Sequence, residues 1–281
     1  MQIDEFRYRA SDGVVLYARV RAPEEQPRGV VALIHGLGEY GGRYEAIARQ
    51  FVTRGYVFVA GDLRGHGVSE GRRAFVSRLD VFMDDLDRYL LEVISHYRGL
   101  PTFTYAFSMG SSLSAAWLIR RHPALNGAIL CSGSYVMPEA SRRVMDKARL
   151  LSLIAPALVI PNGMGPIRDK VCHDASILDA YDADPLVYKK VTIGLAVALA
   201  EAGNEALACA SRIRVPVLIM HGEGDVIALP EGSKRVAESI TGDVTLKMWP
   251  GLYHFLHHEP DGEGERVISA AADWMDGHLP R

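Results

Sequence analysis

One serine stands where an apolar, strand-like run meets a helical stretch. Ser108 follows TFTYAF and precedes MGSSLSAAWLIRR. A sharp strand-to-helix turn exposes a serine hydroxyl above a sheet, where it can attack a carbonyl carbon. The residues two before and two after such a serine must be small because the backbones approach closely, and here they are Ala106 and Gly110. The pattern predicts a nucleophile, although by itself it also fits a serine that caps a helix.

A serine hydroxyl is a weak nucleophile, so it needs a base and a carboxylate that orients the base. In parallel sheets with such a turn, the acid and then the histidine follow the serine along the chain, each beyond the carboxyl end of a strand. Asp225 comes after the apolar run VPVLIM and the turn HGEG, and His254 comes after VTLKMW and PGLY. We therefore predict a catalytic triad of Ser108, His254 and Asp225.

Other histidines compete for the role of base. His221 lies at a strand end, where a hydrogen-bonded structural role is expected. His257 and His258 enter a helix start and are expected to face solvent. His254 and His257 are three residues apart and could face one metal ion, but the sequence offers no third ligand, so no metal site is predicted.

The segment HGLGE (35–39) follows the strand-like run VVALI directly. Its two glycines allow a backbone N–H to approach the serine. We predict that the N–H groups of Leu37 and Met109 hold the oxyanion that forms during acyl transfer, the second being the residue after the nucleophile. Taken alone, HGLGE also fits a plain glycine-rich turn.

Short apolar runs alternate with helical patterns along most of the chain. The runs at 30–34, 56–60, 128–131 and 217–220 are typical of strands buried on both faces, and residues 80–97 and 263–279 follow a helical period. This alternation predicts an α/β fold with a mostly parallel central sheet flanked by helices. At the start, residues 6–22 predict an antiparallel hairpin at the edge of the sheet.

The alternation breaks between residues 135 and 210, which contain helical patterns and turn residues but no strand with a crossover helix. We predict a helical cap at 135–210 inserted into a core formed by 1–134 and 211–281. The apolar run LLSLIAPALVI (150–160) lies within it. That run could line a channel for an acyl chain, contact lipid surfaces transiently, or meet a second subunit.

Composition excludes several classes of protein. The 281 residues carry a formal net charge of −3 without a basic stripe, so no nucleic-acid partner is expected. The charged N-terminus has no apolar secretory segment, and three cysteines cannot form a disulfide framework, so we expect a cytoplasmic protein. The glycine-containing GDLRGHG (61–67) lacks the Gly-Lys-Ser/Thr ending of a phosphate loop. No cofactor is predicted.

Several segments together resemble the monoacylglycerol lipase family of α/β-hydrolases, which includes bacterial lysophospholipase-like esterases. They are HGLGEYGGRY (35–44), GDLRGHGVSEG (61–71), SMG (108–110), AYDADPLV (180–187) and PGLYHFLHHEP (250–260). The resemblance implies an α/β-hydrolase fold with the same triad and oxyanion donors, and a cap that forms an apolar acyl channel. By motif position, it also implies that Glu39, Arg43 and Tyr181 receive the polar head group.

The sequence departs from the family just before the nucleophile. Family members usually have Gly-His there, and this chain has Ala106 and Phe107. Phe107 places a ring on the head-group side, where the family has a polar group. We expect a serine ester hydrolase that acts on monoacylglycerol-like lipid esters. The alternatives are a carboxylesterase or lysophospholipase with another preference, and a catalytically silent fold that serves as a ligand receptor.

Overall fold

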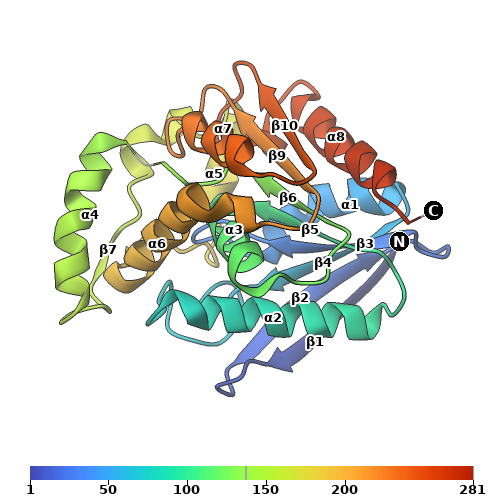
Figure 1. Cartoon of the computed structure of the whole chain (residues 1–281), viewed down its shortest axis with the longest axis horizontal. Coiled ribbons are helices and arrows are strands. Elements are labelled where there is room, and N and C mark those ends of the chain that lie inside the picture. The colour runs from blue at the N-terminus through green and yellow to red at the C-terminus, as the bar shows by residue number, and fades with distance from the viewer. Residues whose placement is uncertain (137, 281) are drawn as a thin grey trace.

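The chain folds around an eight-stranded sheet (Figure 1). The computed structural model describes residues 1–136 and 138–280, with only the backbone at 139–144. The strands of this sheet are β1 (Gln2–Arg9), β2 (Val15–Ala22), β3 (Gly29–Ile34), β4 (Tyr56–Asp62), β5 (Thr102–Phe107), β6 (Gly127–Cys131), β9 (Val217–Gly222) and β10 (Val244–Trp249). Their order across the sheet is β1-β2-β4-β3-β5-β6-β9-β10.

The predicted mostly parallel sheet is confirmed. β1 and β2 form the antiparallel edge hairpin, β2 pairs antiparallel with β4, and the other pairs are parallel. Every residue of β3, β4, β5, β6 and β9 is buried, as the continuous apolar runs predict. Because β3, β5, β9 and β10 run in the same direction, the loops that follow them meet at one edge of the sheet.

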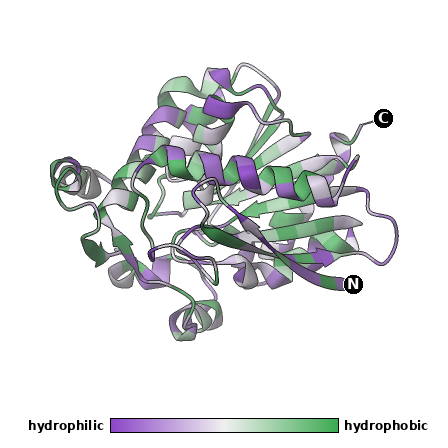
Figure 2. Ribbon diagram, turned by 90° about the horizontal axis from the view of Figure 1, so that it is seen from below, coloured by the Kyte–Doolittle hydropathy of each residue, from purple (hydrophilic) through white to green (hydrophobic). Residues whose placement is uncertain are grey.

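Helices cover both faces of the sheet. They are α1 (Glu45–Thr53), α2 (Leu79–His96), α3 (Met109–Arg121), α7 (Pro230–Ser239) and α8 (Glu263–Gly277). α2, α3 and α7 pack on one face, where Phe82, Trp117 and Val236 share a core, and α1 and α8 pack on the other, where Phe51 and Ile268 share a second core. The helices in Figure 2 alternate green and purple along their length, as expected of helices with one apolar face.

The insertion at 135–210 leaves the sheet after β6 and returns before β9. Its elements are α4 (Glu139–Ser152), β7 (Val159–Pro161), η2 (Gly165–Lys170), α5 (Ala175–Ala183), β8 (Lys190–Thr192) and α6 (Ile193–Cys209). The insertion adds no strand to the central sheet, but it contains two strands that the sequence did not indicate, because β7 and β8 pair as a short antiparallel ribbon. Strands of three residues are too short to leave a periodic pattern in the sequence.

One stretch of the described residues, Ile193–Arg212, is long and apolar enough to cross a membrane by composition alone. It comprises α6 and the turn η3 (Ala210–Arg212). Half of its most apolar window is buried within the protein. Leu195, Ala198, Ala202 and Ala206 belong to the same apolar core as α3, which is the packing of a core helix.

Candidate active site

Ser108 lies at the turn between β5 and α3 in a strained backbone conformation. Its φ angle is 51° and its ψ angle is −114°, a region that residues with a Cβ rarely adopt. The close approach predicted at this turn is present, because a Cβ on Gly110 would lie 2.0 Å from the carbonyl oxygen of Ile34. Ala106 is fully buried in the sheet between Ile34 and Leu130. The turn therefore points the Ser108 hydroxyl away from the sheet and fixes its position.

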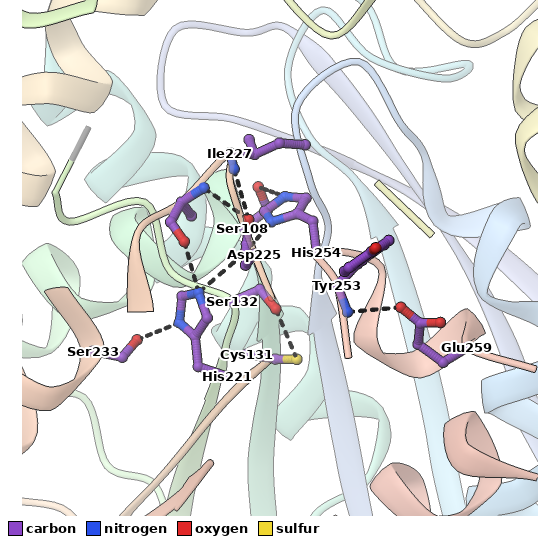
Figure 3. A network of polar contacts seen from close by, with 11 residues as sticks. Ser108, Cys131, Ser132, His221, Asp225, Ile227, Ser233, Tyr253, His254 and Glu259 are labelled. Carbon is purple, nitrogen blue, oxygen red and sulfur yellow. Dashed lines mark hydrogen bonds and ion pairs between the residues drawn. The ribbon is translucent and has the colours of Figure 1, made fainter. Parts of the chain in front are cut away.

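The three predicted residues meet in one hydrogen-bonded chain (Figure 3). His254 Nε2 lies 2.9 Å from Ser108 Oγ, and His254 Nδ1 lies 2.6 Å from Asp225 Oδ2. A carboxylate only accepts, so Nδ1 carries a proton, and Nε2 is free to accept the proton of the serine hydroxyl. This is the arrangement that a general base needs in order to activate a nucleophile.

Asp225 is held as a carboxylate by four donors. Its Oδ1 accepts the backbone N–H groups of Ile227 at 2.8 Å and Ala228 at 3.0 Å, and its Oδ2 accepts from His254 and, at 3.0 Å, from His221. Burial raises the pKa of the Asp225 carboxyl, but the charge on His254 and the hydrogen bonds from both histidines lower it more, so its pKa lies well below the ordinary value. The hydrogen-bonded role expected for His221 is confirmed.

Two backbone amides lie beside the nucleophile without an acceptor among the residues that the structure describes. The N–H groups of Leu37 and Met109 donate to no protein atom there, and both residues line the same small cavity as Ser108 and His254. Met109 is the first residue of α3, so its N–H belongs to the free amides at a helix start. Both residues thus lie at the cavity that holds Ser108, and their role as oxyanion donors stays a prediction.

His35 fixes the loop that carries Leu37. It is fully buried, its Nδ1–H donates to the carbonyl of Gly36 at 2.8 Å, and its Nε2 accepts the backbone N–H of Leu63 at 2.9 Å. Burial lowers the pKa of His35 to about 4, so the ring stays neutral and keeps both bonds at ordinary pH. Leu63 belongs to the GDLRGHG segment, which therefore serves here as a support for the HGLGE loop.

A buried carboxylate missed by the sequence analysis fixes the loop of His254. Glu259 Oε1 accepts the backbone N–H of Tyr253 at 2.8 Å, and its Oε2 accepts from His173 Nδ1 at 2.7 Å and from the His173 backbone N–H at 3.3 Å. His173 belongs to the insertion, and its ring stacks on that of Tyr253. Glu259 therefore ties the insertion to the residue that precedes His254. Its place in HHEP offered no signal of burial.

We expect replacement of Glu259 by alanine to lower the free energy of unfolding by roughly 2–4 kcal/mol, because two backbone N–H groups and an imidazole lose their acceptor. The turnover of esters should fall as well, since the His254 loop loses its anchor. Chemical denaturation and steady-state kinetics would measure the two effects. Glu263→Ala, which removes a partly exposed carboxylate paired with Arg266, is the matched control and should change stability by about 0.5 kcal/mol or less. Equal effects of the two variants would contradict the role given to Glu259.

The prediction that His257 and His258 face solvent was wrong. His257 is 4% exposed and packs against Phe107 and Tyr44 in the turn η4 (Leu256–His258). Burial lowers the pKa of His257 well below its ordinary value and the pKa of His258 to about 4. The helix α8 begins only at Glu263 and packs closely on η4, so His257 lies under it, whereas His258 is half-buried.

The predicted head-group residues lie together at the site. Glu39, Tyr181 and Phe107 line the cavity above Ser108, whereas Arg43 does not line it and instead contacts Glu39 and Tyr181. Arg43 Nε lies 3.2 Å from Glu39 Oε1, and its guanidinium lies over the Tyr181 ring. The ion pair is buried, with 8% of the Arg43 side chain and 2% of the Glu39 side chain exposed. The sequence analysis did not identify Tyr44 as part of this group, but its hydroxyl donates to Glu39 Oε2 at 2.8 Å.

The cavity above Ser108 has a volume of about 100 Å³ and continues into a larger one of about 510 Å³. The residues that line both are Leu37, Ser134, Asn162, Met164, Leu199 and Ile227. The larger cavity has mostly apolar walls, and most of these come from the insertion, including Ile160, Ile167 and Val191. Within the residues that the structure describes, no group of three or more His, Cys, Asp or Glu side chains could hold a metal ion.

A nucleophile at a strand-to-helix turn, with its base and acid beyond later strands of one parallel sheet, defines a serine hydrolase of the α/β-hydrolase class. The family profile described as serine aminopeptidase, S33, matches residues 25–261, and the chain belongs to this family. The resemblance to monoacylglycerol lipases that the motifs indicate is confirmed by the relatives that follow.

The monoacylglycerol lipase of Mycolicibacterium smegmatis is 32% identical over 279 residues, which cover 98% of each chain. The monoglyceride lipase of Homo sapiens is 32% identical over 256 residues, covering 89% of this chain and 82% of that one. The crystal structure of the Paleococcus ferrophilus monoacylglycerol lipase superposes with a TM-score of 0.82 at 27% identity and covers 99% of this chain and 100% of that chain. These similarities extend over nearly the whole chain, insertion included.

Proposed function

We propose that this protein hydrolyses monoacylglycerol-like esters of fatty acids through an acyl-enzyme on Ser108. The observation that carries the proposal is the chain of hydrogen bonds from Ser108 through His254 to Asp225 beside two free amides and a large apolar cavity. The lipases among its relatives support the substrate class.

In the proposed mechanism, His254 takes the proton from Ser108 as the hydroxyl oxygen attacks the ester carbonyl. The amides of Leu37 and Met109 stabilise the tetrahedral oxyanion, and the loss of one such donor typically costs roughly 100- to 1,000-fold in turnover. The alcohol leaves with the proton that His254 returns. Water then repeats the sequence on the acyl-enzyme, while Asp225 keeps the imidazole in the required tautomer.

The two cavities support a division of the substrate between them. An acyl chain fits the larger apolar cavity, because its burial there removes apolar surface from water. The alcohol part faces Glu39 and Tyr181, which are two of the polar residues that line the smaller cavity. Phe107 lies against the ring of His254 on this side and narrows the space for a head group. The insertion therefore serves as the cap of the site, with the core formed by 1–134 and 211–281.

Labelling with a fluorophosphonate tests the proposed function directly. A serine activated as described should form a phosphonyl adduct at Ser108, which peptide mass spectrometry would locate. Hydrolysis of a panel of monoacylglycerols, lysophospholipids and p-nitrophenyl esters of graded length should then show a preference for long-chain monoacylglycerols. Failure to label Ser108 would indicate a silent fold, and a preference for short soluble esters or lysophospholipids would replace the proposed substrate.

The cap carries an exposed apolar surface that supports transient contact with lipid. Leu150, Leu153, Ile154 and Leu158 are 72%, 81%, 83% and 48% exposed. Leu150 lies in the last turn of α4, and the other three residues follow this helix in the chain. Met145 of the same helix lines the larger cavity. A lipid surface at this position would bring acyl chains next to the cavity that we propose receives them.

We expect Leu153→Asp combined with Ile154→Asp to weaken binding to phosphatidylcholine vesicles by at least about tenfold, because burial of one such side chain contributes roughly 1.5–3 kcal/mol. Co-sedimentation with vesicles measures the change. Hydrolysis of a short p-nitrophenyl ester should stay at the wild-type rate, since neither residue lines a cavity at the site. Unchanged vesicle binding in the double variant would contradict the lipid contact.

A further inference from the structure

A second histidine is bonded to the carboxylate that orients His254 (Figure 3). His221 is fully buried at the end of β9, and its Nε2 lies 3.0 Å from Asp225 Oδ2 and 2.9 Å from the carbonyl oxygen of Ala228. On the other side of the ring, Nδ1 lies 2.6 Å from the hydroxyl of Ser233 on α7. The hydrogen-bonded chain that begins at the serine therefore does not end at Asp225.

The neighbours of His221 determine which nitrogen is protonated. Both partners of Nε2 are acceptors, so Nε2 carries a proton and donates it to Asp225 and Ala228. Nδ1 can then accept the hydroxyl proton of Ser233. Asp225 Oδ2 consequently accepts two imidazole N–H groups at once, from His254 and from His221.

We propose that His221 is a positioning residue for the ester hydrolysis, which holds Asp225 Oδ2 toward His254 and draws part of its negative charge away from that histidine. This inference rests on the proposed function. The Asp225 carboxylate is held against rotation, because the backbone amides of Ile227 and Ala228 donate to its other oxygen, Oδ1. The donation from His221 also reduces the negative charge that Asp225 presents to His254, because one oxygen accepts from both rings.

Other ionisable groups also face the His254–Asp225 pair. They are Cys131 at the end of β6, His257 in η4, and the Glu39–Arg43 ion pair across the cavity. Burial raises the pKa of Cys131 to about 12 and holds the pKa of His257 well below its ordinary value, so both stay neutral near neutral pH. A shift of the pH profile on changing His221 would therefore report on His254.

The test compares His221→Leu with His221→Gln, whose side-chain amide can still donate to Asp225. We expect His221→Leu to lower kcat roughly tenfold to a hundredfold, because a small misplacement of a reacting group has costs of this size. The acidic limb of its kcat/KM profile should move to higher pH by about 0.5–1 unit, since Asp225 then presents more negative charge to the catalytic base. His221→Gln should restore the limb to its wild-type position.

Ser233→Ala is the matched control, since it removes the hydroxyl on Nδ1 and leaves the donor on Nε2 in place, and its acidic limb should not move. The low-field proton resonance of His254 Nδ1–H gives a readout without substrate, and it should shift in His221→Leu but not in Ser233→Ala. The proposal would be overturned if folded His221→Leu kept both the limb and the resonance, or if Ser233→Ala shifted them equally. Ester turnover that survives Ser108→Ala would instead refute the proposed function. The resonance of His254 Nδ1–H would still test the contact between His221 and Asp225, because it needs no substrate.

Discussion

Ser108→Ala should lose ester turnover by a factor on the order of 10⁶, because the acyl-enzyme cannot form without the hydroxyl. The oxyanion amides and the cavity remain, so a small rate above that in water should persist. The substitution removes one oxygen and keeps the strained backbone at φ 51°, which alanine adopts at a similar cost. Steady-state hydrolysis of a p-nitrophenyl ester, together with a thermal unfolding curve, would measure the loss and confirm the fold.

Ser114→Ala is the matched control for this variant. Ser114 lies on α3, directly after the nucleophile turn, is fully buried, and has no hydrogen-bond partner for its hydroxyl among the residues that the structure describes. Its replacement should leave turnover at the wild-type level and change stability little, because no hydrogen bond is lost. Retention of more than about 1% of turnover in Ser108→Ala would contradict the assignment of the nucleophile, since a serine of this kind has no substitute.

Asp225→Asn should lower kcat by about 10⁴, because the amide would impose the wrong tautomer on the catalytic base. The amides of Ile227 and Ala228 must still donate to an oxygen, so the asparagine Oδ1 is fixed there and its NH₂ group faces His254. His254 Nδ1 must then accept, and the proton moves to Nε2, where it faces Ser108 and prevents base catalysis. Pre-steady-state kinetics of acylation would isolate this step.

The same substitution separates chemistry from binding. KM or the affinity for a non-hydrolysable ester analogue should change little in Asp225→Asn, since Asp225 does not line the cavity that receives the substrate. A loss of affinity as large as the loss in kcat would show that Asp225 acts on the shape of the site and not on the tautomer. Asp243→Asn, on an exposed carboxylate whose only hydrogen-bond partner among the described residues is His278, is a suitable control.

Much of the core fold could be predicted from the sequence because its strands are buried on both faces. Continuous apolar runs such as 30–34 and 128–131 identify β3 and β6, and the helical period identifies α2 and α8 within a few residues. The structure of the insertion was harder to predict from the sequence. Its helices pack on one another and on α3, and its two short strands are far apart along the chain, so no local pattern indicates their pairing.

The residues of the active site also fall into those that the sequence indicates and those that it does not. The types and order of Ser108, Asp225 and His254 are visible along the chain, since each follows a strand of one parallel sheet and parallel strands end at one edge. The burial of His257 and the role of Glu259 were not visible. Both depend on what packs above the loop, namely α8 and the insertion residue His173.

The amino-acid sequence by itself therefore determined the α/β order and the residues that meet as nucleophile, base and acid, because these follow from local hydrophobic pattern and chain direction. Only the tertiary structure decided the second histidine on Asp225, the buried ion pair of Glu39 and Arg43, and the connection of the small cavity to the large apolar one. Those features join side chains that are distant along the chain, and their burial and protonation depend on neighbours that only the folded protein brings together.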